Sequence, residues 1–188
     1  VLPFVTDSTG TISSSSSLSS AQTNPSGVHI STVSGDPSTE ATFTWQDSVS
    51  PSSLRIGTTS RVYDRTIAGV QFSYSGPAGG VSNMYAATAS GLTPSTTYYY
   101  QVGSDPNEYS FRTALARGSR QPFTFAALAD HGRSGAGYSP NAPTLVATNI
   151  ARDNPDLVLL PGDVHYCSDQ TCVDQYFTDV AGLFAARS

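Results

Sequence analysis

Seven short segments with the pattern of β-strands, between Gly27 and Thr113, constrain the fold of this chain more than any other feature. The segments are residues 28–33, 41–45, 54–57, 70–74, 83–87, 98–102 and 109–112. Gly, Pro, Asp and Ser separate them, and several of them alternate apolar with polar residues, which places one face of each strand on a core. Short strands at this spacing predict two packed sheets, a β-sandwich.

One segment carries a more specific pattern. Residues 92–102 read L-x-P-x-T-x-Y-x-Y-x-V, which resembles the tyrosine-corner strand of fibronectin type III domains. The resemblance implies that the Tyr98 hydroxyl bonds back to the backbone upstream, while Leu92 and Val102 face the core. Trp45 would then fill the core opposite. Stacking of a carbohydrate on an exposed tyrosine is the alternative role for these aromatic residues.

The sequence pattern changes after the sandwich. Strand 123–130 is followed by a glycine-rich loop. The segment Ala142 to Asp153 predicts a helix, with Leu145, Val146, Asn149 and Ile150 at positions i, i+1, i+4 and i+5. It ends at Asn154-Pro155, because a residue before proline avoids the helical region. Strand 156–161 follows. A second helix is indicated by apolar residues at three-to-four spacing, namely Val173, Tyr176, Phe177, Val180, Leu183 and Phe184. This β-α-β-α order is the opening of a parallel α/β sheet.

The chain is therefore expected to have four parts. They are a serine-rich low-complexity arm (1–26), a fibronectin type III-like all-β sandwich (27–115), a linker (116–122) and an incomplete α/β domain (123–188).

Each strand of the α/β part delivers acidic residues to its carboxyl end. Asp130 follows the first strand, and Asp163 and Tyr166 follow the second. Ligands of open α/β sheets bind at the carboxyl ends of the strands, so we expect these side chains around one point. Carboxylate and phenolate oxygens suit a hard metal ion, and a strongly Lewis-acidic ion can remove the phenol proton.

The motifs Asp-x-Gly at 130–132 and Gly-Asp-x-x-Tyr at 162–166, behind a fibronectin-like sandwich, resemble purple acid phosphatases of the calcineurin-like metallophosphoesterase superfamily. The resemblance implies that Asp130 binds Fe(III), that Asp163 bridges the two metals, and that Tyr166 is the phenolate responsible for the purple colour. The second ion would be divalent Fe, Zn or Mn. The implied activity is acid phosphatase hydrolysis of phosphomonoesters by metal-activated water.

The sequence also departs from that family. The motifs Gly-Asn-His-Glu/Asp, Val-x-x-His and Gly-His-x-His do not occur in it, so three of the seven expected metal ligands are present and no catalytic residue is assigned. His131 and His165 occupy variable positions of the two motifs. They either support the metal ligands or the substrate, or fill space as neutral polar residues, and His29 belongs to the sandwich.

These features predict the N-terminal portion of a secreted metallophosphoesterase, with little or no activity as an isolated chain and completed by a remaining catalytic fragment. An extracellular structural or adhesive module is the alternative, in which the incomplete sheet pairs with other copies of the chain.

Composition bears on partners and compartment. The net charge of −5 and the absence of a basic patch argue against nucleic acid as a partner. No apolar run is long enough to span a bilayer, and a start other than Met without a signal peptide fits a processed, extracellular chain. Cys167 and Cys172 are either a local disulfide or two free thiols, because no further Cys or clustered His completes a zinc site.

Overall fold

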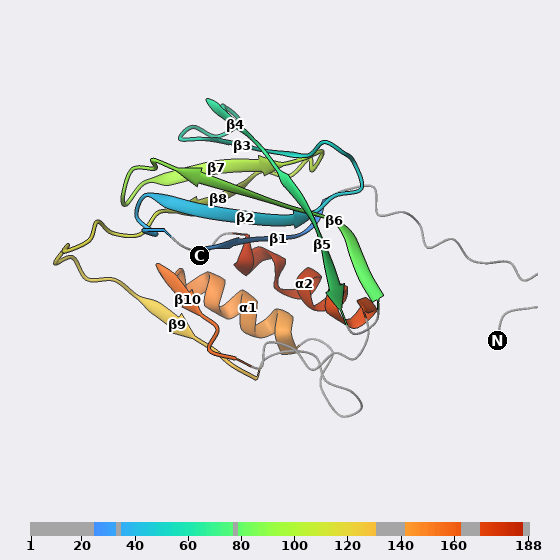
Figure 1. The fold of residues 1–188 in the computed structure, drawn as a ribbon. Coiled ribbons are helices and arrows are strands. Elements are labelled where there is room, and N and C mark those ends of the chain that lie inside the picture. Colours follow the sequence, from blue (N-terminus) through green and yellow to red (C-terminus); the bar gives the residue numbers. More distant parts are fainter. Residues whose placement is uncertain (1–24, 33–34, 77–78, 131–141, 163–169, 186–188) are drawn as a thin grey trace, which may run out of the picture.

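The computed structural model describes residues 25–32, 35–76, 79–130, 142–162 and 170–185. Within these residues, eight antiparallel strands form two four-stranded sheets that pack face to face (Figure 1). The first sheet has the order β1 (Ser26–Ser31), β2 (Glu40–Gln46), β6 (Gly79–Ser90) and β5 (Val70–Gly76). The second has the order β4 (Arg65–Ala68), β3 (Ser53–Gly57), β7 (Thr97–Val102) and β8 (Tyr109–Arg112). The predicted sandwich is thus present.

Aromatic side chains from both sheets fill the sandwich core. Trp45 and Phe43 of β2 are fully buried, and the Trp45 ring stacks on Tyr85 of β6 with centroids 5.9 Å apart. Phe43 packs on Tyr100 of β7 at 4.6 Å, which joins the two sheets. The Trp45 Nε1–H donates to Ser52 Oγ at 2.9 Å, so the buried indole is satisfied.

The predicted tyrosine corner is confirmed. The Thr93 N–H donates to the Tyr98 hydroxyl at 2.9 Å, and Leu92 and Val102 are buried in the core. The sequence motif therefore marks the position of β7 and the turn before it.

Several details of the sandwich differ from the sequence prediction, and the longest strand, β6 (Gly79–Ser90), extends past the predicted segment 83–87 at both ends. The strand β4 was not predicted, because Arg65-Thr66-Ile67-Ala68 is short and charged and only half buries Arg65 and Ile67 at the edge of its sheet. In addition, β1 begins at Ser26, inside the predicted low-complexity arm.

Among the described residues, two helices follow the sandwich, and neither is long and apolar enough to cross a membrane. Helix α1 (Ala142–Asp153) has the predicted bounds. Asn154 ends it in a left-handed conformation with φ of 51°, and its N–H bonds to the carbonyls of Ile150 and Ala151 at 3.2 Å. Helix α2 (Gln170–Phe184) also has the predicted position.

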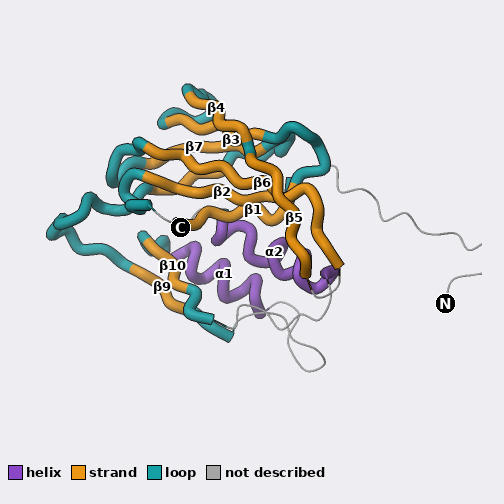
Figure 2. The backbone as a smooth tube through the Cα atoms, viewed as in Figure 1, coloured by secondary structure: helices purple, strands orange, loops and turns teal. Residues whose placement is uncertain are grey.

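The helices form a layer between the sandwich and a second, smaller sheet (Figures 1 and 2). Their shared core comprises Ala147 of α1 and Tyr176, Val180 and Leu183 of α2, against which Val158 of the small sheet packs. Leu145 and Val146, two of the apolar residues of α1, are exposed. The buried stripe of α1 instead follows Pro143 and Ala147 toward α2.

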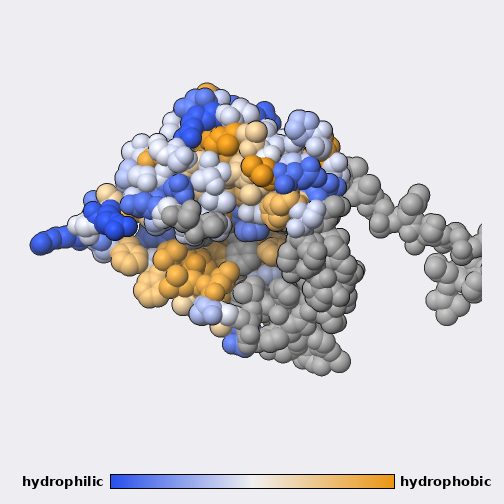
Figure 3. Space-filling view, viewed as in Figure 1, coloured by the Kyte–Doolittle hydropathy of each residue, from blue (hydrophilic) through white to orange (hydrophobic). Residues whose placement is uncertain are grey.

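The small sheet consists of β9 (Phe125–Ala127) and β10 (Leu157–Leu159) in parallel. Both strands are shorter than the predicted 123–130 and 156–161, because each has one neighbour in the described part of the chain and the ladder ends where pairing ends. Phe123 and Phe125 are 57% and 58% exposed, and Figure 3 shows an apolar patch over this region.

Candidate functional site

The parallel pairing of β9 with β10 brings the two predicted ligand-bearing strand ends to one edge. Phe125 pairs with Leu157 and Ala127 with Leu159, and the Leu128 N–H donates to the Leu159 carbonyl at 3.0 Å beyond the paired residues. Both strands therefore end at the same edge of the sheet, as predicted for a β-α-β unit.

Asp130 lies just beyond the carboxyl end of β9. It is exposed and adopts a φ of 53°, a left-handed conformation that non-glycine residues seldom occupy and that Asp tolerates better than most. Such backbone outliers gather at ligand-binding sites. The carboxylate is thus placed on the predicted edge of the sheet.

The other predicted site residues fall outside the described part of the chain. These are Asp163, Tyr166, His131, His165 and Cys167. The described residues contain no cluster of three or more His, Cys, Asp or Glu that could hold a metal ion. Cys172 lies half-buried near the start of α2, so its pairing with Cys167 stays a prediction.

The opposite, amino end of the strand pair carries a polar cluster that sequence reasoning missed. Asp156 Oδ2 accepts the Thr124 N–H at 2.9 Å, and the Asp156 N–H donates to the Thr124 carbonyl at 2.9 Å. Asp156 Oδ1 also lies 3.7 Å from Arg112 Nη1 at the end of β8. The only signal in the sequence is an acidic residue after Pro155, at the start of the predicted strand.

Helix α2 is tied to the sandwich at two points. The buried Tyr100 hydroxyl donates to the Ala185 carbonyl at 2.6 Å, and the Phe177 ring stacks on His29 of β1 at 5.9 Å. Burial raises the pKa of Tyr100 well above its usual value, so the hydroxyl stays a donor. The sandwich therefore packs against one side of the helix layer.

A sequence model of a known family matches the sandwich. The family is described as purple acid phosphatase, N-terminal domain, and the match covers residues 25–113.

Curated relatives and a solved structure extend the likeness. Purple acid phosphatase 21 of Arabidopsis thaliana is 30% identical over 142 residues, which cover 76% of this chain and 30% of that protein. Acid phosphatase A of Cryphonectria parasitica is 35% identical, over 42% of this chain and 20% of that protein. The structure of purple acid phosphatase PPD1 from yellow lupin (Lupinus luteus) seeds superposes with a TM-score of 0.71 at 16% identity, over 88% of this chain and 34% of that one.

The match to purple acid phosphatase 21 spans 142 residues, whereas the family match ends at residue 113. The similarity therefore continues past the sandwich. This chain spans about a third of the length of these plant proteins. On these grounds, the chain is identified as carrying the N-terminal domain of the purple acid phosphatase family.

Proposed function

We propose that this chain is the N-terminal portion of a secreted purple-acid-phosphatase-like metallophosphoesterase. It would contribute the sandwich and the first β-α-β-α of a catalytic domain that hydrolyses phosphomonoesters at a dinuclear metal centre. The observation that carries the proposal is the parallel pair β9–β10, which follows the family domain directly and carries Asp130 at its carboxyl edge.

The donor chemistry fits the metal that the resemblance requires. Asp130 would bind Fe(III), Asp163 would bridge to a divalent Fe, Zn or Mn ion, and Tyr166 would bind Fe(III) as a phenolate. All three offer hard oxygen donors. When bound, such ions supply an activated water and stabilise the transferring phosphoryl group. The position of Asp130, an exposed residue just beyond the carboxyl end of β9, supports this role.

The chain alone is proposed to have little or no phosphatase activity. Its sequence supplies three of seven expected ligands, and two carboxylates with one phenol hold a second metal weakly. The Cys167–Cys172 disulfide and export from the cell belong to the same proposal, since disulfides persist in oxidising compartments.

Hydrolysis of a chromogenic phosphomonoester tests the proposal in the full-length natural protein, whose intact mass shows whether more chain follows Ser188. We expect Asp130→Asn and Asp163→Asn each to lower kcat/KM at least a hundredfold. Asp64→Asn, at an exposed site before β4, is the matched control and should retain parental activity. Parental activity in Asp130→Asn would refute the assignment.

The isolated 188-residue chain provides the second measurement. We expect no hydrolysis above background with Fe(III) and Mn(II) added, and robust turnover by the pure chain would refute the proposed dependence on further ligands. The family match does not favour the structural or adhesive alternative. A defined oligomer in sedimentation, together with an inactive full-length protein, would revive it.

A further inference from the structure

The register of β9 against β10 is poorly specified by the strands themselves. Each strand contributes three paired residues, and the runs Phe125-Ala126-Ala127-Leu128 and Leu157-Val158-Leu159-Leu160 are apolar throughout. A strand with alternating character is fixed in register, because a slip of one residue moves its apolar side chains to the wrong face. A uniformly apolar strand lacks this constraint.

Polar contacts at the amino end of the pair supply what the strands lack. Asp156 and Thr124 hold each other reciprocally, since each backbone N–H finds an acceptor on the other residue at 2.9 Å. The Thr124 Oγ1 lies 3.3 Å from the same Asp156 Oδ2. A slip by one residue would break these bonds together. The cluster therefore selects one register.

Asp156 also connects this register to the sandwich. Its second carboxylate oxygen faces Arg112 Nη1 at 3.7 Å. Arg112 ends β8, whereas Asp156 immediately precedes β10. The Asp156 carboxylate thus contacts Arg112 at the end of β8 and Thr124 just before β9, while Asp156 itself precedes β10.

The register at the amino end determines the alignment of the carboxyl end. A slip of one residue moves a strand by about 3.3 Å along its axis, which is nearly the ~3.5–4 Å between two metal ions that share a bridging carboxylate. An offset of that size would separate Asp130 from the chain that follows β10. Two side chains cannot bind the same metal ion when one of them is displaced by that distance.

We infer that Asp156 is a positioning residue that locks the register of β9 and β10 and so aligns Asp130 with the carboxyl end of β10. Its link to the metal rests on the proposed function. The register lock itself does not, because it follows from contacts between described residues alone.

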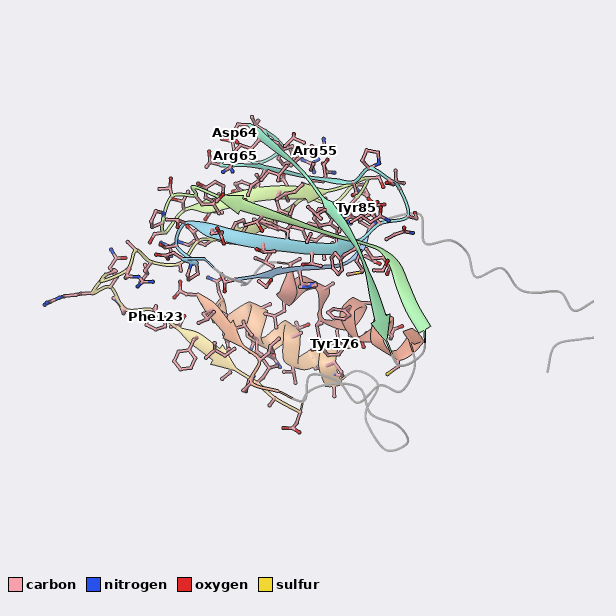
Figure 4. All side chains as sticks on the ribbon, viewed as in Figure 1. Arg55, Asp64, Arg65, Tyr85, Phe123 and Tyr176 are labelled. Carbon is pink, nitrogen blue, oxygen red and sulfur yellow. The ribbon has the colours of Figure 1, made fainter. Side chains whose placement is uncertain are left out.

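Amide hydrogen exchange in this chain tests the lock. Asp156→Ala removes the acceptor for Thr124 N–H, and we expect the Leu128 amide, which bonds to Leu159 across the pair, to exchange about tenfold faster. Asp156→Asn keeps an acceptor oxygen and should stay within about twofold of the parent. Asp64→Ala, at an exposed Asp on the β4 side away from β9 (Figure 4), should leave Leu128 unchanged, and Thr93 in the sandwich should be unchanged in all variants. Equal Leu128 exchange in Asp156→Ala and Asp64→Ala would overturn the inference.

Calorimetric titration of the full-length natural protein with Mn(II) tests the positioning role. We expect about tenfold weaker binding in Asp156→Ala, as for other residues that orient metal ligands, and recovery in Asp156→Asn. Faster Leu128 exchange with unchanged Mn(II) affinity would show that Asp156 does not position the ligands. If the parent protein binds no metal, the proposed function fails, and the exchange measurement still decides whether Asp156 holds the register.

Discussion

Two buried tyrosine hydroxyls make different contacts, although both lie on β7. Tyr98 accepts a hydrogen bond from the Thr93 N–H in the turn before β7. The motif that predicts this contact therefore lies within a few residues of sequence. Tyr100 donates to Ala185, which is far away in the chain. The first contact was predictable, whereas the second depends on where α2 packs.

Replacing Tyr98 by Phe removes the acceptor for the Thr93 N–H while the ring stays buried. We expect the free energy of unfolding to fall by about 1 kcal/mol, because the turn before β7 loses its hydrogen bond to the Tyr98 hydroxyl. Urea unfolding measures this. Tyr99→Phe, on the half-exposed face of the same strand, is the control and should change stability by less than about 0.5 kcal/mol. Equal effects of the two substitutions would argue against a stabilising tyrosine corner at Tyr98.

Buried tyrosines also predict loss of stability in alkali. Burial raises the pKa of Tyr100 and of Tyr176 above the usual value, and burial with a bond to Asp105 raises that of Tyr109. In the unfolded chain these phenols ionise near pH 10, so the unfolded state binds fewer protons above that pH. The free energy of unfolding should then fall by up to about 1.4 kcal/mol per pH unit for each tyrosine.

Urea unfolding at pH 8, 10 and 11 measures that slope. Tyr100→Phe removes one titrating group and should make the fall above pH 10 shallower. A free energy of unfolding that is constant from pH 9 to 11 would contradict the assignment of these phenols as buried and neutral.

At the scale of elements, boundaries were predicted best where local chemistry stops a helix or turns a strand. The bounds of α1 follow from Asn154-Pro155, and β7 follows from its tyrosine motif. The edge strand β4 and the buried face of α1 were missed for another reason. Both depend on which neighbour an element packs against, and periodicity does not report the neighbour.

The matched pair Leu183→Ala and Leu145→Ala tests which helix faces carry stability. Leu183 of α2 is 2% exposed and Leu145 of α1 is 61% exposed. We expect Leu183→Ala to lower the free energy of unfolding by about 2–4 kcal/mol through lost burial and a cavity, and Leu145→Ala to change it by less than about 0.5 kcal/mol. Urea unfolding compares them. A large effect at Leu145 would mean that the exposed side of α1 is covered in solution.

At the scale of the whole molecule, the sequence predicted the sandwich from its alternating pattern and the helix layer from its helical pattern. It also predicted the parallel pair β9–β10. It did not predict how the layers are joined. The joints are single side chains, namely His29 on Phe177, Tyr100 on Ala185 and Arg112 with Asp156. Each pairs residues far apart in the chain, and although Tyr100 belongs to the motif of residues 92–102, that motif does not indicate Ala185 as its partner.

Those joints predict that the sandwich and the helix layer unfold together. Trp45, the single tryptophan, lies in the sandwich core, while the described helices lie in the other layer, where Tyr176 is labelled in Figure 4. Trp45 fluorescence and helical circular dichroism should therefore give coincident urea transitions. Because α2 packs on the sandwich, Leu183→Ala should shift both midpoints by the same amount. Two separate midpoints, with Trp45 insensitive to Leu183→Ala, would show that the layers are independent domains and that the sandwich does not support the strand pair.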